Sequence, residues 1–334
     1  MADRNDRRTA VVDADASGHR AIYFHWLACI EGLNPEVQLL GTPPNLLVRR
    51  VVWALKLVRI GHCYQRIIFS TAEPFLHFWP LMQVTGVRTC YLVHRTSRFV
   101  RSSSLLARWY RRGLRATILV VDHTQISIFA AAFPRASVVP STHPHSPALL
   151  ASPASSAAGA TRSVLTVGVI GGKRSDRCLD VLVEALGLVE RRKRGLSFRI
   201  VRVNPADTDE PGPWEVRRVD LQTDHAYLRQ VAEFDVFWAV KQDPLSYFAS
   251  TVIEAATLGT PVLTQANAWA LETAKGTPLI EAVDVTSVEV VADALSRLVA
   301  LDGSIVRQSA SALRTEFHPR HFMARVLHAC AQTE

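Results

Sequence analysis

The sequence predicts an α/β protein of two domains, each built on a mainly parallel β-sheet, with a cleft between the domains. Short apolar runs alternate with longer segments of helical spacing, which is the pattern of strand–helix–strand crossovers. The alternation stops at residues 151–162, a segment of small residues with Pro and Gly that is typical of a linker, and then restarts. A length of 334 residues also exceeds one ordinary core and fits two domains.

The first domain is expected over residues 21–150. Apolar and aromatic runs predict its strands, and helical spacing predicts its helices. The strands are expected at residues 21–27, 66–70, 89–93 and 116–121, and the helices at residues 46–60 and 103–114. Residues 1–20 hold several charges and no apolar run of the kind found in a secretory signal, so they are expected to form a flexible tail.

The second domain is expected over residues 163–316, where the same alternation continues. Strands are predicted at residues 163–170, 197–203, 216–220, 234–240 and 261–264. Helices are predicted at residues 177–191, 225–232, 251–258 and 288–301. A last helix is expected at residues 322–331, within a terminal segment of residues 317–334.

The composition is that of a globular protein, with 48% hydrophobic and 20% charged residues, and no stretch approaches the roughly 20 apolar residues that span a bilayer. The five cysteines are far apart and never form a C-x-x-C pair, which argues against a disulfide framework or a zinc site and favours the cytoplasm. Of the 38 Lys and Arg residues, 19 precede Ser163, whereas only 8 of the 30 Asp and Glu residues do. The basic first half and the near-neutral second half are therefore expected to meet different partners.

Residues 243–266 carry the most informative pattern. A strand ends, a polar loop follows, and a helix is predicted to begin near Ser250 and Thr251, with Glu254 in its first turn. The backbone N–H groups at a helix N-terminus bind phosphate, and the two hydroxyls add donors. A carboxylate one turn further along accepts hydrogen bonds from ribose hydroxyls. The alternative is that Glu254 is only a favourable charge near a helix N-terminus.

A second pattern follows the first strand of this domain. A glycine turn ending at Gly172 leads into Lys173, Arg174 and Arg177, and then into a helix. Two cations beside a leaving diphosphate stabilise the charge that develops as the bond to it breaks. The alternative is a solvated basic turn, because Lys and Arg are common on surfaces.

Together the two patterns resemble glycosyltransferase family 4 of the GT-B superfamily. That family has two glutamates in a pattern like E-G-F-G-x-x-x-x-E-A-x-A-x-G-x-P-V, and this chain matches it at Phe248, Glu254, Ala255, Ala256, Gly259, Pro261 and Val262. The first glutamate of the family falls on Ser246, and Asp243 could replace it from a shifted loop. The resemblance is good over residues 163–330 and fainter over residues 21–147.

The resemblance implies a GT-B fold of two facing Rossmann-like domains. It also implies transfer of a sugar from a nucleoside-diphosphate donor, with no metal or other cofactor and with retention of anomeric configuration. Lys173 or Arg174, with Arg177, would hold the diphosphate beside Gly172, and Phe248 would belong to the same donor site. Family members send the last helix back to the first domain, which implies the same for residues 317–334.

His94 follows the predicted strand 89–93, at the edge where α/β sheets bind ligands. The family has a histidine here that helps to position the reacting sugar or the acceptor, so the candidate catalytic residues are His94, Ser246 and Asp243. Arg95 stands where the family has an acid. His25 and Glu73 follow other predicted strands and, with Arg95, are the candidates on the acceptor side.

From Arg95 to Arg115, seven arginines are interleaved with apolar and aromatic residues. Such a segment can lie on an anionic membrane surface, which would make the protein peripheral to the membrane. It can also attract a phosphate-bearing acceptor or be a solvated helix face. Contact with nucleic acid is the reading that the sequence favours least.

Asp207 and Asp209 resemble a metal-binding D-x-D, but they lie in a loop rich in Pro and Gly, so no metal is expected. A non-catalytic GT-B-fold binding or partner subunit is the main alternative function, because Ser246 replaces a family glutamate. A nicotinamide-dependent oxidoreductase is a further alternative, against which the missing G-x-G-x-x-G counts. The acceptor is open among a glycan, a lipid-linked sugar, a natural product and a protein.

Overall fold

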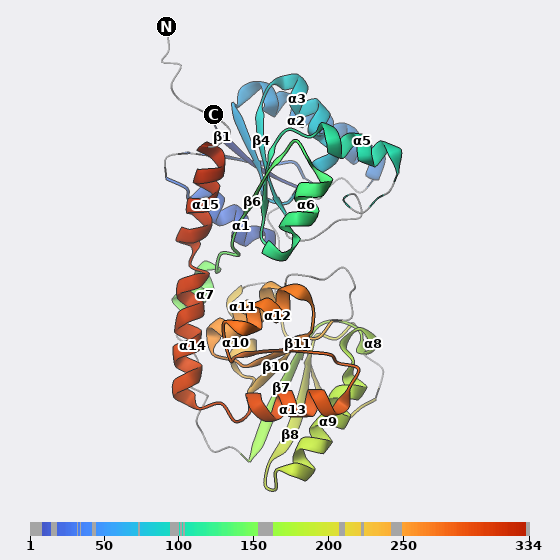
Figure 1. The fold of residues 1–334 in the computed structure, drawn as a ribbon, viewed down its shortest axis with the longest axis vertical. Helices are drawn as coiled ribbons and strands as arrows, with labels where there is room; N and C mark the ends of the chain where they lie inside the picture. Colours follow the sequence, from blue (N-terminus) through green and yellow to red (C-terminus); the bar gives the residue numbers. More distant parts are fainter. Residues whose placement is uncertain are drawn as a thin grey trace. The chain divides into compact units, whose positions relative to one another are not determined.

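The computed structural model describes residues 9–14, 19–31, 33, 35–41, 45–72, 74–93, 100, 102, 104–152, 163–206, 211–221, 224–241 and 249–331. The chain divides into two compact units. Unit 1 comprises Met1–Pro144 and Phe317–Glu334, and unit 2 comprises His145–Glu316. Each unit is an α/β sandwich around one sheet (Figure 1).

Unit 1 contains a six-stranded sheet in the order β2-β1-β3-β4-β5-β6, with every neighbouring pair parallel. The strands are β1 (Thr9–Asp13), β2 (Glu36–Leu39), β3 (Arg66–Phe69), β4 (Arg88–Val93), β5 (Thr117–Val120) and β6 (Ser137–Pro140). Because the strands are parallel, their carboxyl ends all lie at one edge of the sheet and their amino ends at the other.

Helices cover both faces of this sheet, as a parallel sheet requires. They are α1 (His19–Ala28), α2 (Leu46–Cys63), α3 (Trp79–Thr85), α5 (Leu105–Gly113), α6 (Ile126–Ala132) and α15 (Pro319–Ala331). Side chains of α2, α3 and α6, such as Trp53, Met82 and Phe129, share one core with Phe69 and Tyr91 of the sheet. On the other face α15 packs against β5 and α1. Unit 1 therefore includes the last helix of the chain.

The N-terminal part of the prediction was wrong in two places. The strand expected at residues 21–27 is helix α1, and the first strand is β1, inside the segment expected to be a flexible tail. An apolar run of this length does not distinguish a buried strand from a buried helix. Tyr23 stacks edge-on against Phe322 of α15, with ring centroids 5.6 Å apart, so the run is apolar because it packs between helices and the sheet.

Unit 2 repeats the plan with a parallel sheet in the order β12-β11-β10-β7-β8-β9. The strands are β7 (Val164–Ile170), β8 (Ser197–Val203), β9 (Trp214–Arg217), β10 (Val236–Trp238), β11 (Val262–Gln265) and β12 (Ile280–Val283). Four strands lie where the sequence predicts them, β9 begins two residues before its predicted place, and β12 has no predicted counterpart.

The helices of unit 2 are α7 (Pro147–Ala151), α8 (Arg174–Arg177), α9 (Leu179–Arg192), α10 (Asp224–Ala232), α11 (Ser250–Leu258), α12 (Ala268–Lys275), α13 (Val288–Leu298) and α14 (Gly303–Glu316). Leu182 and Leu186 of α9 share a core with Leu295 of α13 and with Val167 and Trp238 of the sheet. Helices α10 and α14 both contact α11. Among the helices that the structure describes in either unit, none has the length and hydropathy needed to cross a bilayer.

Candidate functional site

A double-glycine turn marks the carboxyl end of β7 in unit 2. Gly171 and Gly172 have φ angles of +60° and +76°, in the left-handed region that glycine adopts without strain. The turn is tied to the neighbouring strand β8, because Gly171 N–H donates to the carbonyl of Val203 at 2.8 Å and Ala206 N–H donates to the carbonyl of Gly172 at 3.0 Å. The predicted glycine turn is therefore present and held at the sheet edge.

Arg177, the last residue of α8, spans this edge. Its guanidinium donates to the carbonyl oxygens of Ile170 at 2.8 Å, Gly171 at 3.3 Å and Val240 at 3.0 Å. These bonds use three of the five N–H donors of the side chain. Burial lowers the pKa of Arg177 from its usual value, and the charge of Arg202 acts in the same direction. Arg177 is thus a positioned cation that joins the end of β7 to the segment after β10.

Helix α11 begins at Ser250 beside the same edge. Nearly all of its residues are buried, and Gly259, with a φ of +87°, ends it by donating to the carbonyl of Ala256. Ser250 and Glu254 are 7% and 4% exposed. Because the helix starts at Ser250, Glu254 lies in its second turn and not in the first turn that the sequence predicts. A buried carboxylate one turn into a buried helix is a costly feature that points to a function.

Tyr227 of α10 joins this group, although sequence reasoning missed it. Burial raises the pKa of Tyr227 well above its usual value, the nearby charge of Glu254 raises it further, and the charge of Arg177 lowers it. Tyr227 therefore lies near both Glu254 and Arg177. The hydroxyl of Tyr227 is buried and bonds to no residue that the structure describes. No motif in the sequence marks this tyrosine, because tertiary packing brings α10 to the site.

The two other cations of the basic turn differ in their surroundings. Lys173 precedes α8 and is exposed. The guanidinium of Arg174 pairs with Asp180 and lies 5.2 Å from the ring centroid of Trp214. The choice between Lys173 and Arg174 as the partner of Arg177 stays a prediction.

Several predicted residues lie outside the part of the chain that the structure describes. They are Glu73, His94, Arg95, Asp243, Ser246 and Phe248, together with Asp207 and Asp209. Their catalytic and acceptor-side assignments stay predictions. The sequence predicts that His25 follows a strand, and this prediction was wrong. His25 is an exposed residue of α1, and its ring centroid lies 4.8 Å from that of Trp26.

Two acids lie at or after the ends of strands in unit 1. Asp13 at the end of β1 accepts hydrogen bonds from the hydroxyls of Ser70 and Thr71, which follow β3. Asp122 after β5 accepts hydrogen bonds from Thr124 and from Gln125. Both carboxylates are fully buried. Their oxygens bond within the strand-end loops, so these acids hold the carboxyl edge of the sheet together.

Several solved structures have a similar fold. HepE from Anabaena, in complex with UDP, has a TM-score of 0.68 at 12% identity, and the match covers 98% of this chain and 100% of that one. A glycosyltransferase from Rickettsia africae has a TM-score of 0.70 at 12% identity, with 97% of each chain covered. Sucrose-phosphate synthase from Thermosynechococcus elongatus has a TM-score of 0.68 at 14% identity, with 98% of this chain and 99% of that one covered.

No protein-family model and no curated protein sequence matches the chain. Likeness at such low identity establishes the fold. Two parallel six-stranded sheets with flanking helices, matched over nearly the full length of these structures, are the GT-B architecture, so the predicted fold class is confirmed. Membership of glycosyltransferase family 4 stays a prediction.

Proposed function

We propose that the protein is a glycosyltransferase whose donor, a nucleoside-diphosphate sugar, binds at the carboxyl edge of the unit 2 sheet. The observation that carries the proposal is the convergence of Arg177, Tyr227 and Glu254, from three different helices, beside the double-glycine turn. A cation, a hydroxyl and a carboxylate at one edge match the diphosphate and ribose of a nucleotide. The structures of HepE with UDP and with UDP-glucose support such a donor on this fold.

Each group has a role in donor binding. Lys173 and the two N–H groups of Arg177 that its three carbonyl partners do not use would hold the diphosphate. Gly172 would let the phosphates approach the backbone closely, because it has no Cβ. The N–H groups at the start of α11, with the hydroxyls of Ser250 and Thr251, would bind a phosphate oxygen, and Glu254 would accept hydrogen bonds from the ribose.

The reaction follows from this placement. The bond between the anomeric carbon and the donor phosphate oxygen breaks, and its electron pair stays on the diphosphate, where Lys173 and Arg177 stabilise the new charge. The acceptor oxygen forms the new bond to the anomeric carbon, and its proton passes to the departing diphosphate or to water. We propose that transfer retains configuration and needs no metal, with His94 and either Asp243 or Ser246 beside the reacting carbon and Phe248 in the donor site; the resemblance to family 4 supports these points. We also propose a cytoplasmic location, which the five free thiols support.

Donor binding by the full chain tests the proposal. Calorimetric titration with UDP and UDP-glucose should show binding, and Glu254→Gln and Arg177→Ala should each weaken it about tenfold or more, because each removes a charged hydrogen-bonding partner. The exposed Glu289 of α13 provides a matched control, since Glu289→Gln removes the same charge away from the site. Affinity of the wild-type level in a folded Glu254→Gln protein would refute the assignment.

Turnover separates the enzyme from the non-catalytic alternative, which the presence of Ser246 favours. Release of UDP from UDP-glucose, with acceptors or by slow hydrolysis, would support the enzyme. A protein that binds the donor and releases no UDP with any acceptor class would instead be a binding subunit. The panel of acceptors should include glycans, lipid-linked sugars and small natural products.

A further inference from the structure

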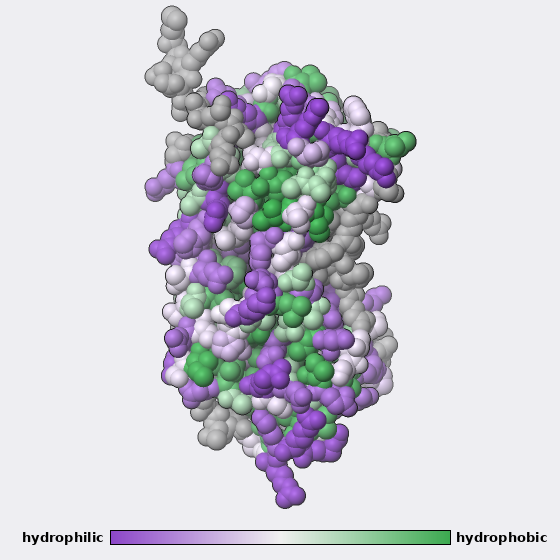
Figure 2. All heavy atoms as spheres, in the orientation of Figure 1, coloured by the Kyte–Doolittle hydropathy of each residue, from purple (hydrophilic) through white to green (hydrophobic). Residues whose placement is uncertain are grey.

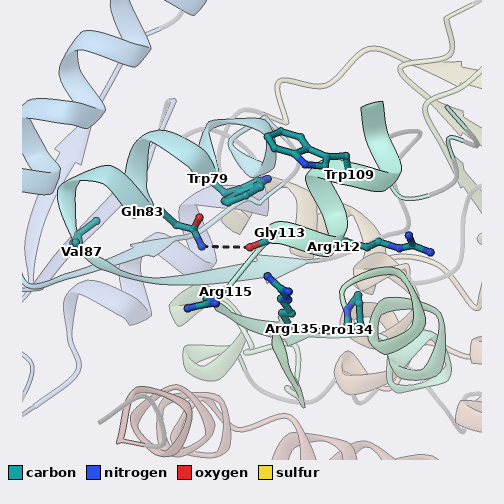
Figure 3. Close-up of a pocket in the computed structure, with 10 residues that line it drawn as sticks. Trp79, Gln83, Val87, Trp109, Arg112, Gly113, Arg115, Pro134 and Arg135 are labelled. Carbon is teal, nitrogen blue, oxygen red and sulfur yellow. Dashed lines mark hydrogen bonds between the residues drawn. The ribbon is translucent and has the colours of Figure 1, made fainter. Parts of the chain in front are cut away.

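A hollow of about 900 Å³ lies at the amino edge of the unit 1 sheet (Figure 3). Its lining comes from helices α3 and α5 and from the turns that lead into β4, β5 and β6, and includes Trp79, Trp109, Arg112, Gly113, Arg115 and Arg135. His94 and Glu73 follow the carboxyl ends of β4 and β3, which lie at the opposite edge of the same sheet. The hollow therefore lies at the edge of the sheet opposite to the strand ends that precede these candidate residues in the sequence.

Three arginines supply the charge of this hollow. Arg112, Arg115 and Arg135 are exposed, and none of their guanidinium groups bonds to a residue that the structure describes. In the view of Figure 3, Arg115 and Arg135 lie below the hydrogen bond from Gln83 to Gly113, and Arg112 extends away from them.

The surrounding sequence offers little negative charge to neutralise these cations. Between Val37 and Ser175 the sequence contains only Glu73 and Asp122 as acids. Asp122 is fully buried after the carboxyl end of β5 and bonds to Thr124 and Gln125. An uncompensated group of guanidinium ions at one edge of a domain attracts anions, and the planar guanidinium suits phosphate oxygens in particular.

Two tryptophans line the hollow, and packing against neighbouring residues holds Trp79 in place. Trp79 is 6% exposed, and its ring lies so close to Gly113 that a Cβ there would stand 2.3 Å from Cη2. The Nε1–H of Trp79 is buried and bonds to no residue that the structure describes. Gln83 Nε2 donates to the carbonyl of Gly113 at 3.3 Å, which ties α3 to the end of α5. The ring of Trp109, 63% exposed, lies 6.3 Å from that of Trp79 and offers an apolar surface.

We propose that this hollow is a binding site for a phosphate group, held by Arg115 and Arg135, with the apolar or ring-shaped part of the ligand against Trp109. Val84, which follows Gln83 on α3, and Leu105, one turn before Trp109 on α5, are also highly exposed. Figure 2 shows hydrophilic side chains gathered over the upper end of unit 1 with apolar side chains directly below them. Phosphate on a lipid headgroup and phosphate on a soluble molecule share this chemistry.

Two binding measurements on the full chain distinguish these sources. One is titration with inorganic pyrophosphate, and the other is co-sedimentation with vesicles of phosphatidylcholine containing phosphatidylglycerol, against phosphatidylcholine alone. Arg115→Ala/Arg135→Ala should weaken at least one of the two about tenfold. Arg229→Ala/Arg307→Ala is the matched control, because both arginines are exposed on helices of unit 2 and the net charge changes equally.

Loss of pyrophosphate binding alone would identify a soluble phosphate, and loss of vesicle binding alone a lipid headgroup; loss of both shows that the site accepts either. Hydrogen exchange locates the contact: pyrophosphate or vesicles should protect residues 109–117 and 133–137. Protection confined to residues 171–177, or equal weakening by the control pair, overturns the proposal. With UDP saturating the proposed donor site, the pyrophosphate titration reports this hollow alone, so the donor site and this site can fail separately. An unchanged melting temperature verifies that the exposed arginines were removed without unfolding.

Discussion

Arg177 donates to the carbonyl oxygen of Val240 at 3.0 Å, which ties helix α8 to the chain that leaves β10 toward α11. The same guanidinium also holds the carbonyls of Ile170 and Gly171 at the end of β7. One side chain thus fixes two of the segments that form the proposed donor site. Its structural role and its proposed ligand role can be separated by substitutions that keep the charge.

Arg177→Lys should destabilise unit 2 although it keeps the positive charge. A single ammonium group cannot replace the planar fork that reaches three carbonyls at once, and hydrogen bonds from a charged group contribute about 1.5–3 kcal/mol each. With partial exposure to solvent, we expect a loss of about 2 kcal/mol in the free energy of unfolding, measured with urea. Arg229→Lys on the exposed face of α10 is the control and should have no effect. Equal stability of the two variants would contradict this role.

Gly172→Ala should disturb the site more than a positive φ angle alone explains. A Cβ at Gly172 would stand 2.4 Å from Nε of Arg177, in addition to the strain of a φ of +76°. Gly195 has a φ of +87° and nothing within 4 Å of its Cβ position, so Gly195→Ala measures the backbone strain by itself, about 1–2 kcal/mol. We expect Gly172→Ala to cost more than Gly195→Ala and to weaken UDP binding, which Gly195→Ala leaves unchanged. Equal urea midpoints for Gly172→Ala and Gly195→Ala would show that the Arg177 side chain moves away from the added methyl group at no cost in stability.

Tyr227→Phe should affect stability and donor binding in opposite directions. The buried hydroxyl bonds to no described residue, and leaving such a group unsatisfied costs about 1–3 kcal/mol, so its removal should leave the free protein equally stable or more stable. If a bound donor satisfies the hydroxyl, the same change should weaken UDP about tenfold. Calorimetry and thermal unfolding measure the two effects. A destabilised protein with intact UDP affinity would mean that the tyrosine is structural.

Four strands of unit 2, β7, β8, β10 and β11, were predictable because each is a short apolar run bounded by turn residues. Strand β1 was not predictable from the local sequence. Its five buried residues follow a charged segment, and they form a strand because they pair in parallel with β2 and β3, which lie further along the chain. Helix α1 was mistaken for a strand because its apolar residues face both α15 and the sheet. Pairing and packing between distant segments override local pattern in both cases.

In the candidate site, the sequence predicted the glycine turn and the helix, but it did not predict the directions of the side chains. Gly172 and Lys173 lie on a turn and Glu254 lies one turn into a helix, and the sequence marks both places with glycine, charge and small polar residues. The direction of Arg174 depends on Asp180 and on the ring of Trp214, which β9 brings beside it. Tyr227 reaches the site only because α10 packs against α11. No motif in the sequence indicates either contact, because the residues involved lie on different elements that only the fold brings together.

Gly113→Ala should disrupt the proposed phosphate site in the hollow of unit 1, because the added methyl group would collide with Trp79. The added Cβ would stand 2.3 Å from Cη2 of a ring that is almost fully buried, so the indole or the turn must move. Forcing an extra methyl into a packed core costs about 1–3 kcal/mol, which should appear as a lower melting temperature. Gly187→Ala in α9 is the matched control, because its Cβ meets only the end of Arg191 at 3.5 Å, and alanine in a helix should be neutral or stabilising. Equal melting temperatures for both variants would argue against close packing of Trp79 on the turn.

His77 should make unit 1 less stable in mild acid. Burial lowers its pKa from 6.5 to about 4, and the nearby charge of Arg50 acts in the same direction. Nε2 is buried and bonds to no described residue, and the ring lies 4.1 Å from that of Phe78. Because the unfolded chain takes up this proton near pH 6.5 and the folded protein only near pH 4, the unfolded state binds more protons in between. The free energy of unfolding therefore falls as the pH drops through this window and levels off below it.

His77→Gln removes this titration, so the difference between wild type and variant isolates it from the acids that titrate in the same range. One pKa unit corresponds to about 1.4 kcal/mol, and after allowance for partial exposure of the ring we expect the wild type to lose about 2 kcal/mol more than the variant between neutral pH and about pH 4.5. Urea unfolding at the two pH values measures the loss. His62→Gln on the exposed face of α2 should follow the wild type. Parallel pH profiles for wild type and His77→Gln would show that the ring is open to water, because a solvated imidazole titrates alike in both states.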